Sequence, residues 1–280
     1  MRPGVLSWCR AQGALVAVPR SLDVRVLWVR TDMILDTPRT WHDMMTGGAS
    51  VGFATRGLGS VAPFVERVAA AGGTLEDDEG EPALATAVTV RAVADLIRLA
   101  RSRGPADIVS WTRDDTTSAL AAGRVAIGAL GSEATARMRR SRFVDRFWIH
   151  PCPDQRSYSS ATVWAVPASC GNLSTSLELV QQLTSFDAQH HDGTTGSIPA
   201  RRDVLEVLEP LDALDERRLE VVCSTIDGGL TALASRPGWG KVEERIADAL
   251  RRTYDGDWKP GDAVAAMQRA GQRAITLARR

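Results

Sequence analysis

The stretch Ala17–Trp41, AVPRSLDVRVLWVRTDMILDTPRTW, decides the fold. Within it, the β-branched and aromatic run Val24–Val29 has the length and composition of a β-strand. Pro19 precedes this run, where a strand tolerates a missing backbone donor. Pro38 disfavours helix in the residue before it, and Thr40 then provides a cap for a new helix. The stretch therefore predicts a strand, a turn, a proline stop and a capped helix, in that order.

This order of elements resembles the middle of the extracellular solute-binding proteins that serve carbohydrate ABC importers. Those proteins have a Gly, then Ala-hydrophobic-Pro, a strand that ends in an aromatic residue and Tyr-Arg-x-Asp-Leu, and then Pro-x-Thr-Trp-Asp-Glu. The matching residues here are Gly13, Ala17-Val18-Pro19, Leu27-Trp28, Arg30, Asp32, Pro38, Thr40-Trp41 and Asp43. Val29 stands where the family usually has Tyr, and His42 where it usually has Asp.

A second cluster of matches lies in the C-terminal half. The amphipathic stretch Ser174–Leu183 and the continuation Ser185–Gln189 resemble a helix of the family and its Leu-Thr-Ser-x-Glu-x-Gln sequence. Gly196–Arg201 matches the Gly-x-x-Pro-x-Arg that follows in the family. The resemblance extends over about Gly13–Leu277, which is nearly the whole chain.

The resemblance implies an α/β fold of the type II periplasmic binding protein class, with two lobes around a hinge and an incomplete first lobe. Residues 1–27 and 166–199 are expected in the remnant of the first lobe, and residues 28–165 and 200–280 in the second. Family members carry further strands and helices of the first lobe before the matched region. We therefore expect that Met1 is not the natural start of a working binder.

The family's missing strands would cover an apolar helix face in this chain. Leu177, Val180, Leu183 and Phe186 fall on one face of an amphipathic segment that needs a sheet to pack against. An apolar face left open favours self-association or local disorder. We expect a stable second lobe and a loose or self-associating remnant of the first.

Composition limits the classes of partner. The chain has 34 basic and 34 acidic residues, so its formal net charge is zero. Binding to nucleic acid or to an acidic membrane surface requires a basic excess, and neither is favoured. Residues 1–14 lack the apolar stretch of a signal peptide, and no run approaches the ~20 apolar residues of a membrane span. Only the resemblance implies a location outside the cytoplasm, either membrane-anchored or periplasmic.

The sequence carries no motif of an enzyme, a metal site or a cofactor site. It has no G-x-S-x-G, no H-E-x-x-H and no complete P-loop. His190-His191-Asp192 are neighbours on an expected helix and point apart, and Glu76–Glu81 lacks the ligand spacing of a calcium loop. Four cysteines favour buried thiols, and Cys152–Cys170 is the best of the disulfide options. We expect binding without chemistry, no cofactor and no metal.

Six residues are candidates for contact with a carbohydrate, because sugar sites use aromatic faces and hydrogen-bonding side chains. They are Trp28, Arg30, Ser132, Ser160, Trp164 and Arg201. Ser132 stands where many relatives carry an aromatic residue that faces the sugar, and Ser160 lies in the expected small-residue loop 157–161.

The three larger candidates each have a structural alternative. Trp28 fits a core position as well as a sugar platform, and Trp164 fits a core position better. Arg201 could form a surface salt bridge in place of a contact with sugar hydroxyls.

The function that the resemblance implies is capture of a small carbohydrate for an ABC importer, with the permease transmembrane subunits as partners. The alternative is a truncated or degenerate solute-binding fragment that has lost its ligand and acts at most as an interaction protein.

Overall fold

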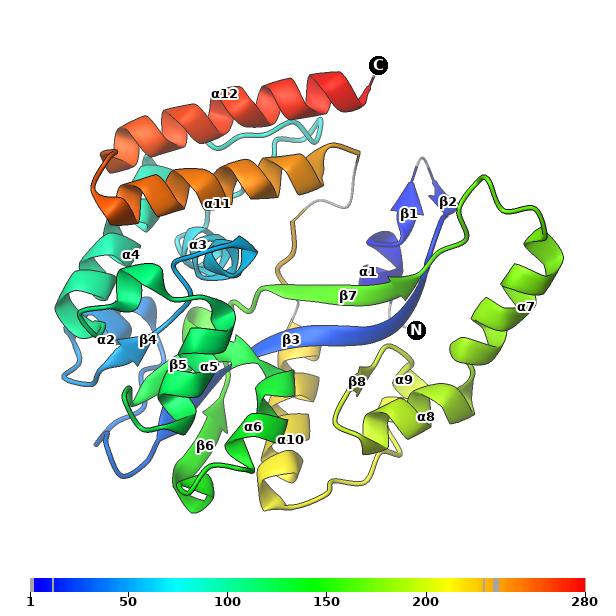
Figure 1. Cartoon of the computed structure of the whole chain (residues 1–280), viewed down its shortest axis with the longest axis horizontal. Helices are drawn as coiled ribbons and strands as arrows, with labels where there is room; N and C mark the ends of the chain where they lie inside the picture. The colour runs from blue at the N-terminus through cyan, green and yellow to red at the C-terminus, as the bar shows by residue number, and fades with distance from the viewer. Residues whose placement is uncertain (1–2, 12, 229, 234–236, 280) are drawn as a thin grey trace.

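A single 13-residue strand, β3 (Val18–Arg30), extends through both parts of the molecule (Figure 1). Its first residues pair antiparallel with β7 (Ser159–Trp164) and β8 (Ile198–Pro199). The computed structural model describes residues 3–11, 13–228, 230–233 and 237–279, so that Met1 lies outside the described residues. The expected strand is thus confirmed, and it begins six residues earlier than its apolar run because the main chain of β7 continues the pairing.

The second half of β3 has other partners. It pairs antiparallel with β5 (Ile127–Gly131) and β6 (Phe147–His150), and β4 (Val51–Gly52) lies parallel to β5. Val24 is the last residue paired with β7, and Arg25 is the first paired with β5. We refer to this change of partners as the crossing.

The crossing divides the chain into two regions. We define the small region as residues 3–24 and 159–205, and the large region as residues 25–158 and 206–279, each without the undescribed positions. The expected lobe boundary between residues 27 and 28 lies close to the crossing. The assignment of the remaining segments to lobes stays a prediction.

Helices surround the four strands β4, β5, β3 and β6 of the large region. They are α2 (Trp41–Thr46), α3 (Val61–Ala70), α4 (Ala87–Arg103), α5 (Arg113–Ala121), α6 (Thr135–Met138), α10 (Ala213–Gly228), α11 (Trp239–Asp255) and α12 (Pro260–Ala278). Short 3-10 turns lie at Leu58–Ser60, Ile108–Ser110, Ser132–Ala134, Val144–Arg146 and Pro153–Gln155. The two last helices pack side by side, with α3 and α4 beneath them (Figure 1).

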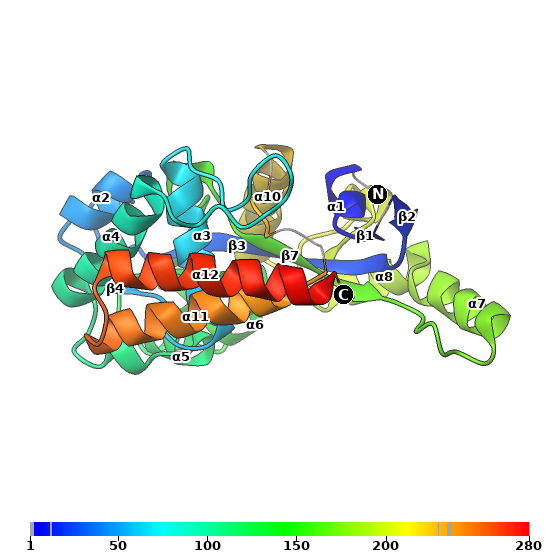
Figure 2. The same ribbon diagram turned by 90° about the horizontal axis from the view of Figure 1, so that it is seen from above.

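The small region has fewer elements around its strands. They are α1 (Pro3–Ser7), β1 (Arg10–Ala11), β2 (Ala14–Leu15), α7 (Leu173–Leu183), α8 (Phe186–Thr194) and α9 (Arg202–Leu205). Helix α7 lies at the outer end of this region, far from the large region (Figure 2). None of its residues is buried.

Local signals explain where several helices begin. Thr40 caps α2, and Asp43 accepts from the Thr40 backbone amide in return, so the expected cap is confirmed as a capping box. The amphipathic pattern of Val88–Arg101 predicts a helix capped by Thr89, and this predicted cap is wrong. Thr86 is the cap, because its hydroxyl accepts from the backbone N–H of Thr89, which leaves Thr89 buried inside α4.

Two other expectations are corrected. Ser160 lies within β7 and not in a loop, because its backbone pairs with Asp23 of β3. No disulfide joins Cys152 and Cys170, because both are free thiols. Cys152 is buried, and this burial raises the pKa of its thiol. Among the described residues, no helix is both long and apolar enough to cross a bilayer.

Candidate ligand-binding site

A buried ion pair lies beside the crossing. The Arg25 guanidinium of β3 donates to Glu66 Oε1 of α3 over 2.8 Å, and both side chains are almost fully buried. The Ser157 hydroxyl donates to the Arg25 carbonyl oxygen over 2.7 Å. The backbone N–H of Tyr158 donates to the same Glu66 oxygen over 3.0 Å. This network fastens β3, α3 and the start of β7 to one another, because a charge buried away from water must keep its partner.

The same network reaches α11. The Tyr158 hydroxyl donates to Glu243 Oε1 over 3.4 Å. Burial, and then the Glu243 carboxylate, raises the pKa of the Tyr158 hydroxyl, and burial also raises the pKa of Glu243. The backbone N–H of Ser159 donates to the Thr231 carbonyl oxygen over 2.8 Å, and Thr231 N–H donates to Ser157. The crossing is therefore held from several elements at once.

Accessible polar groups lie on the crossing itself. Asp23 is half-buried, and its carboxylate Oδ2 lies 3.4 Å from an Arg113 guanidinium nitrogen at the start of α5. The other carboxylate oxygen, Oδ1, is buried without a hydrogen-bond partner among the described residues. Ser160, opposite Asp23 in β7, is exposed. A carboxylate, a guanidinium and a hydroxyl can bind the hydroxyl groups of a polar ligand. We refer to Asp23, Arg113 and Ser160 as the crossing face.

Two of the six sequence-predicted site residues lie at the crossing. Ser160 pairs with Asp23, and Ser132 follows Gly131, which pairs with Arg25. Ser132 is buried and its carbonyl oxygen accepts from the Thr135 hydroxyl over 2.6 Å. Ser132 therefore fixes the end of β5, whereas Ser160 presents its side chain to solvent.

Trp28 is a core residue. Its side chain has no exposed surface, and its ring meets Phe147 edge to face with centroids 6.3 Å apart. The prediction that Trp28 forms a sugar platform is not compatible with this position, because a stacking face must be accessible to the ligand. The alternative that the sequence left open, a core tryptophan, describes the structure.

Arg30 lies at the far end of β3, seven residues and roughly 23 Å from Asp23 at the usual rise of a strand. Its guanidinium binds both oxygens of Asp32, at 2.9 and 2.8 Å, and stacks 3.8 Å from the centroid of Phe143. The hydrogen bonds from Arg30 lower the pKa of Asp32. These contacts fix the end of the strand, and Arg30 does not join the crossing face.

Trp164 and Arg201 both lie in the small region. Trp164 is half-buried beneath Arg20, whose guanidinium carbon is 5.7 Å from the ring centroid. Arg201 binds both carboxylate oxygens of Asp203, at 3.1 and 2.6 Å, as the salt-bridge alternative expected. Their contact with a ligand remains a prediction.

Sequence reasoning missed the charged residues around the crossing. The signal was present: Asp23 and Arg25 interrupt the apolar stretch 22–29 of β3, and Glu66 interrupts the apolar run of α3. A charge inside an apolar run is usually paired when it is buried. Glu243 has no such signal, because α11 is strongly amphipathic and rich in charge.

The crossing offers groups that can recognise a polar ligand. The groups at the crossing face are a carboxylate, a guanidinium and a hydroxyl, which bind hydroxyl ligands without a covalent step. In the part of the chain that the structure describes, no group of three or more His, Cys, Asp or Glu residues is placed to hold a metal ion.

Comparison with solved structures shows the fold. The chain is similar to an ABC transporter solute-binding protein from Thermotoga lettingae bound to α-D-tagatose, with a TM-score of 0.86, 18% identity, and coverage of 98% of this chain and 76% of that one. It is also similar to an ABC transporter solute-binding protein from Agrobacterium radiobacter in complex with ribitol, with a TM-score of 0.83, 16% identity, and coverage of 97% and 74%. Maltose-bound MalE3 of T. maritima gives a TM-score of 0.79, 18% identity, and coverage of 99% and 76%. The α/β architecture is thus that of two-lobe periplasmic binding proteins.

The sequence gives the family. The family model described as bacterial extracellular solute-binding protein matches residues 3–213, well over half of the chain. The resemblance drawn from the two motif clusters is confirmed, and the chain belongs to the bacterial extracellular solute-binding protein family.

Proposed function

We propose that this protein captures a small carbohydrate for an ABC importer and presents it to the permease outside the cytoplasm, without chemical change to the ligand. One observation carries the proposal: accessible polar groups of the crossing face sit where one continuous strand passes between two sets of sheet partners. A ligand held there contacts both regions. It would favour the arrangement of the regions that binds it more tightly, and the permease would recognise that arrangement.

The charges of the crossing face support a ligand rich in hydroxyl groups. The Oδ2 oxygen of the half-buried Asp23 lies 3.4 Å from an Arg113 nitrogen, and a sugar hydroxyl can donate to this oxygen. Arg113 and Ser160 can donate to ring or hydroxyl oxygens of the same ligand. The similar solved structures hold maltose, α-D-tagatose or ribitol, so these three compounds are the first ligands to test.

The experiment is a thermal-unfolding screen with these compounds, followed by calorimetry on the best of them. A ligand present at a hundred times its Kd should stabilise the fold by about 2.7 kcal/mol. Asp23→Asn should weaken binding by about tenfold or more, because asparagine lacks the negative charge and keeps only one of the two acceptor oxygens. Asp107→Asn is the matched control, since Asp107 also pairs with an arginine but lies exposed near α5. Equal binding by both variants would contradict the role of the crossing face.

A second candidate is an interaction protein that has lost its ligand. Helix α7 favours it, because this helix has no buried residue and exposes Leu173, Leu177 and Leu179. The same screen separates the two functions. An interaction protein would show no melting shift with any sugar or sugar alcohol and would associate with itself or with another protein.

A further inference from the structure

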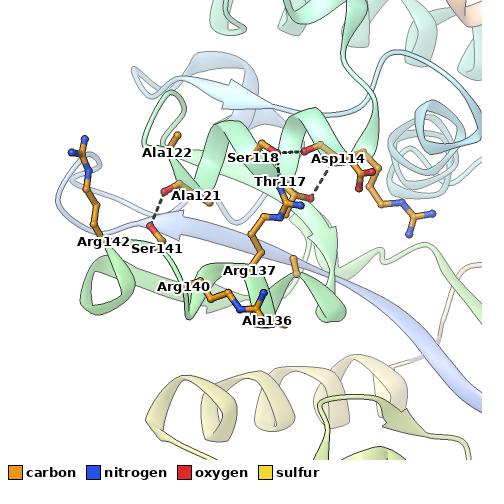
Figure 3. Close-up of a pocket in the computed structure, with 12 residues that line it drawn as sticks. Asp114, Thr117, Ser118, Ala121, Ala122, Ala136, Arg137, Arg140, Ser141 and Arg142 are labelled. Atoms are coloured by element: carbon orange, nitrogen blue, oxygen red, sulfur yellow. Dashed lines mark hydrogen bonds between the residues drawn. The ribbon is translucent and has the colours of Figure 1, made fainter.

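A groove of about 890 Å³ lies between α5 and α6, on the large region (Figure 3). Four arginines and a single carboxylate line it: Arg113, Arg137, Arg140, Arg142 and Asp114. Figure 3 shows Arg137 reaching toward α5, with Arg142 and Asp114 at opposite ends of the groove. This concentration of one charge is unusual in a chain whose net charge is zero.

Three of these arginines have no carboxylate partner. Arg113 pairs with Asp23, whereas Arg137, Arg140 and Arg142 form no ion pair with any residue that the structure describes. Arg139, which directly follows α6, does have carboxylate partners: it binds Asp212 over 2.7 Å and lies 3.5 Å from Asp215. The protein therefore neutralises Arg139 and leaves Arg137, Arg140 and Arg142 without a carboxylate partner among the described residues.

Two of the unpaired guanidinium groups are held in place by other contacts. Arg137 Nη1 donates to the Ser118 hydroxyl of α5 over 2.6 Å. The Arg142 guanidinium lies 4.7 Å from the ring centroid of Phe143, and Arg30 stacks on the same ring. A side chain already held loses less entropy when it binds a ligand. These contacts leave each guanidinium with further donors, because each carries five N–H groups.

The rest of the lining makes room and offers few competing acceptors. Ala121, Ala122, Ala134 and Ala136 line the groove with small side chains. Its hydroxyl groups already donate to the backbone, as when Thr117 donates to the Arg113 carbonyl oxygen and Ser141 to Ala121. The volume falls within the range of ~300–1,000 Å³ of small-molecule sites.

We propose that the α5–α6 groove binds a small polyanion whose charges are phosphate or carboxylate groups. Guanidinium forks match both groups in geometry and form charge-assisted hydrogen bonds to them. This site shares Arg113 with the crossing face, but Arg137, Arg140 and Arg142 belong to it alone, and it does not need the capture of a neutral sugar to operate. The arginines are exposed, so the binding is sensitive to salt, which screens such charges beyond about 10 Å at 0.1 M.

Calorimetry with two probes tests the proposal. Inorganic triphosphate represents the phosphate source and trigalacturonate the carboxylate source, while neutral maltotriose is the ligand control. The variant Arg137→Ser/Arg140→Ser removes two charges from the groove. Arg91→Ser/Arg245→Ser is the matched control, because it removes two exposed arginines that have no ion pair among the described residues and lie on α4 and α11.

We expect the wild type to bind at least one polyanion. Tighter binding of triphosphate would identify phosphate groups as the natural charges of the ligand, and tighter binding of trigalacturonate would identify carboxylate groups. The groove variant should bind the tighter-binding probe about tenfold more weakly, and the control variant within about twofold of the wild type. All targeted side chains are exposed, so both variants should melt within about 2 °C of the wild type. If both variants bound the polyanion equally weakly, the loss would come from the lower net positive charge and not from the groove, and the proposal would be overturned. The absence of polyanion binding by the wild type at low salt would overturn it as well. Neither outcome bears on neutral sugars at the crossing face.

Discussion

The two ends of β3 lie in different surroundings. In the large region, its last six residues, Arg25–Arg30, are all buried. In the small region, only Pro19, Leu22 and Val24 of its first seven residues are buried. The same strand is therefore a central core element at one end and a partly exposed one at the other.

The helices repeat this contrast. Helix α11 buries eight of its residues against its neighbours, whereas α7 buries none. Backbone pairing with β7 and β8 holds the small region together more than apolar packing does, because apolar burial scales with the area removed from water. The difference indicates that the large region is the stable unit and that the small region depends on it.

The largest expected difference in stability is between substitutions of two tryptophans, Trp28 in β3 and Trp164 in the paired strand β7. Trp28→Ala removes a fully buried side chain and should lower the free energy of unfolding by about 3–5 kcal/mol. Trp164→Ala removes a half-buried one in the small region and should lower it by about 1–2 kcal/mol. Urea unfolding of the two variants measures both values. Equal losses would mean that the small region packs as tightly as the large one.

The next difference is between two ion pairs. Glu66→Ala leaves the Arg25 charge buried and unpaired, and should lower the free energy of unfolding by about 3–5 kcal/mol. Asp192→Ala breaks the partly exposed pair with Arg20 in the small region, and should lower it by no more than about 1 kcal/mol. Chemical denaturation gives the comparison. A loss below about 1 kcal/mol for Glu66→Ala would show that water reaches Arg25 when its partner is removed.

Hydrogen exchange compares the regions without any substitution. Amides of β5 (127–131) are paired with β3 and buried, so they should open only with large-scale unfolding. Amides of α7 (173–183) should exchange at least about a hundredfold faster, because local opening of this helix exposes no buried residue. Equal protection of the two segments in a monomeric protein would contradict the contrast between the regions.

The smallest expected effect on stability concerns the exposed leucines. Leu177→Ser/Leu179→Ser should change the free energy of unfolding by less than about 0.5 kcal/mol, since both side chains are more than half exposed. It should reduce any self-association seen by sedimentation velocity, because it shrinks an exposed apolar face. Leu35→Ser/Leu277→Ser is the control, with two exposed leucines of the large region. If the control variant reduced self-association equally, α7 would not be the surface responsible for it.

The sequence allowed prediction of elements whose signals are local. The strand around Val24–Val29, the cap at Thr40 and the two amphipathic helices at the C-terminus all follow from short patterns. The family also follows, because its motifs keep their spacing over most of the chain.

The candidate site was predicted less well, for a physical reason. Alternation along Val24, Val26 and Trp28 describes one face of a strand, but here Leu27 and Val29 are buried as well, so pattern alone did not distinguish core from platform. The position of Arg30 relative to Asp23 depends on where β3 changes partners, which is a long-range property. The pair Arg25–Glu66 joins residues 41 positions apart, and neither residue points to the other in sequence.

The continuous strand β3 also has a consequence for how the chain is made. Its residues leave the ribosome early, but its partners begin only at Ile127, Phe147, Ser159 and Ile198. At roughly 5–20 residues per second, the apolar run of β3 waits for several seconds before its first antiparallel partner exists. During that time it is an unpaired, aggregation-prone edge. Native pairing of the central strand is therefore delayed until β5 has left the ribosome, and overproduction should depend on chaperones that bind extended apolar segments.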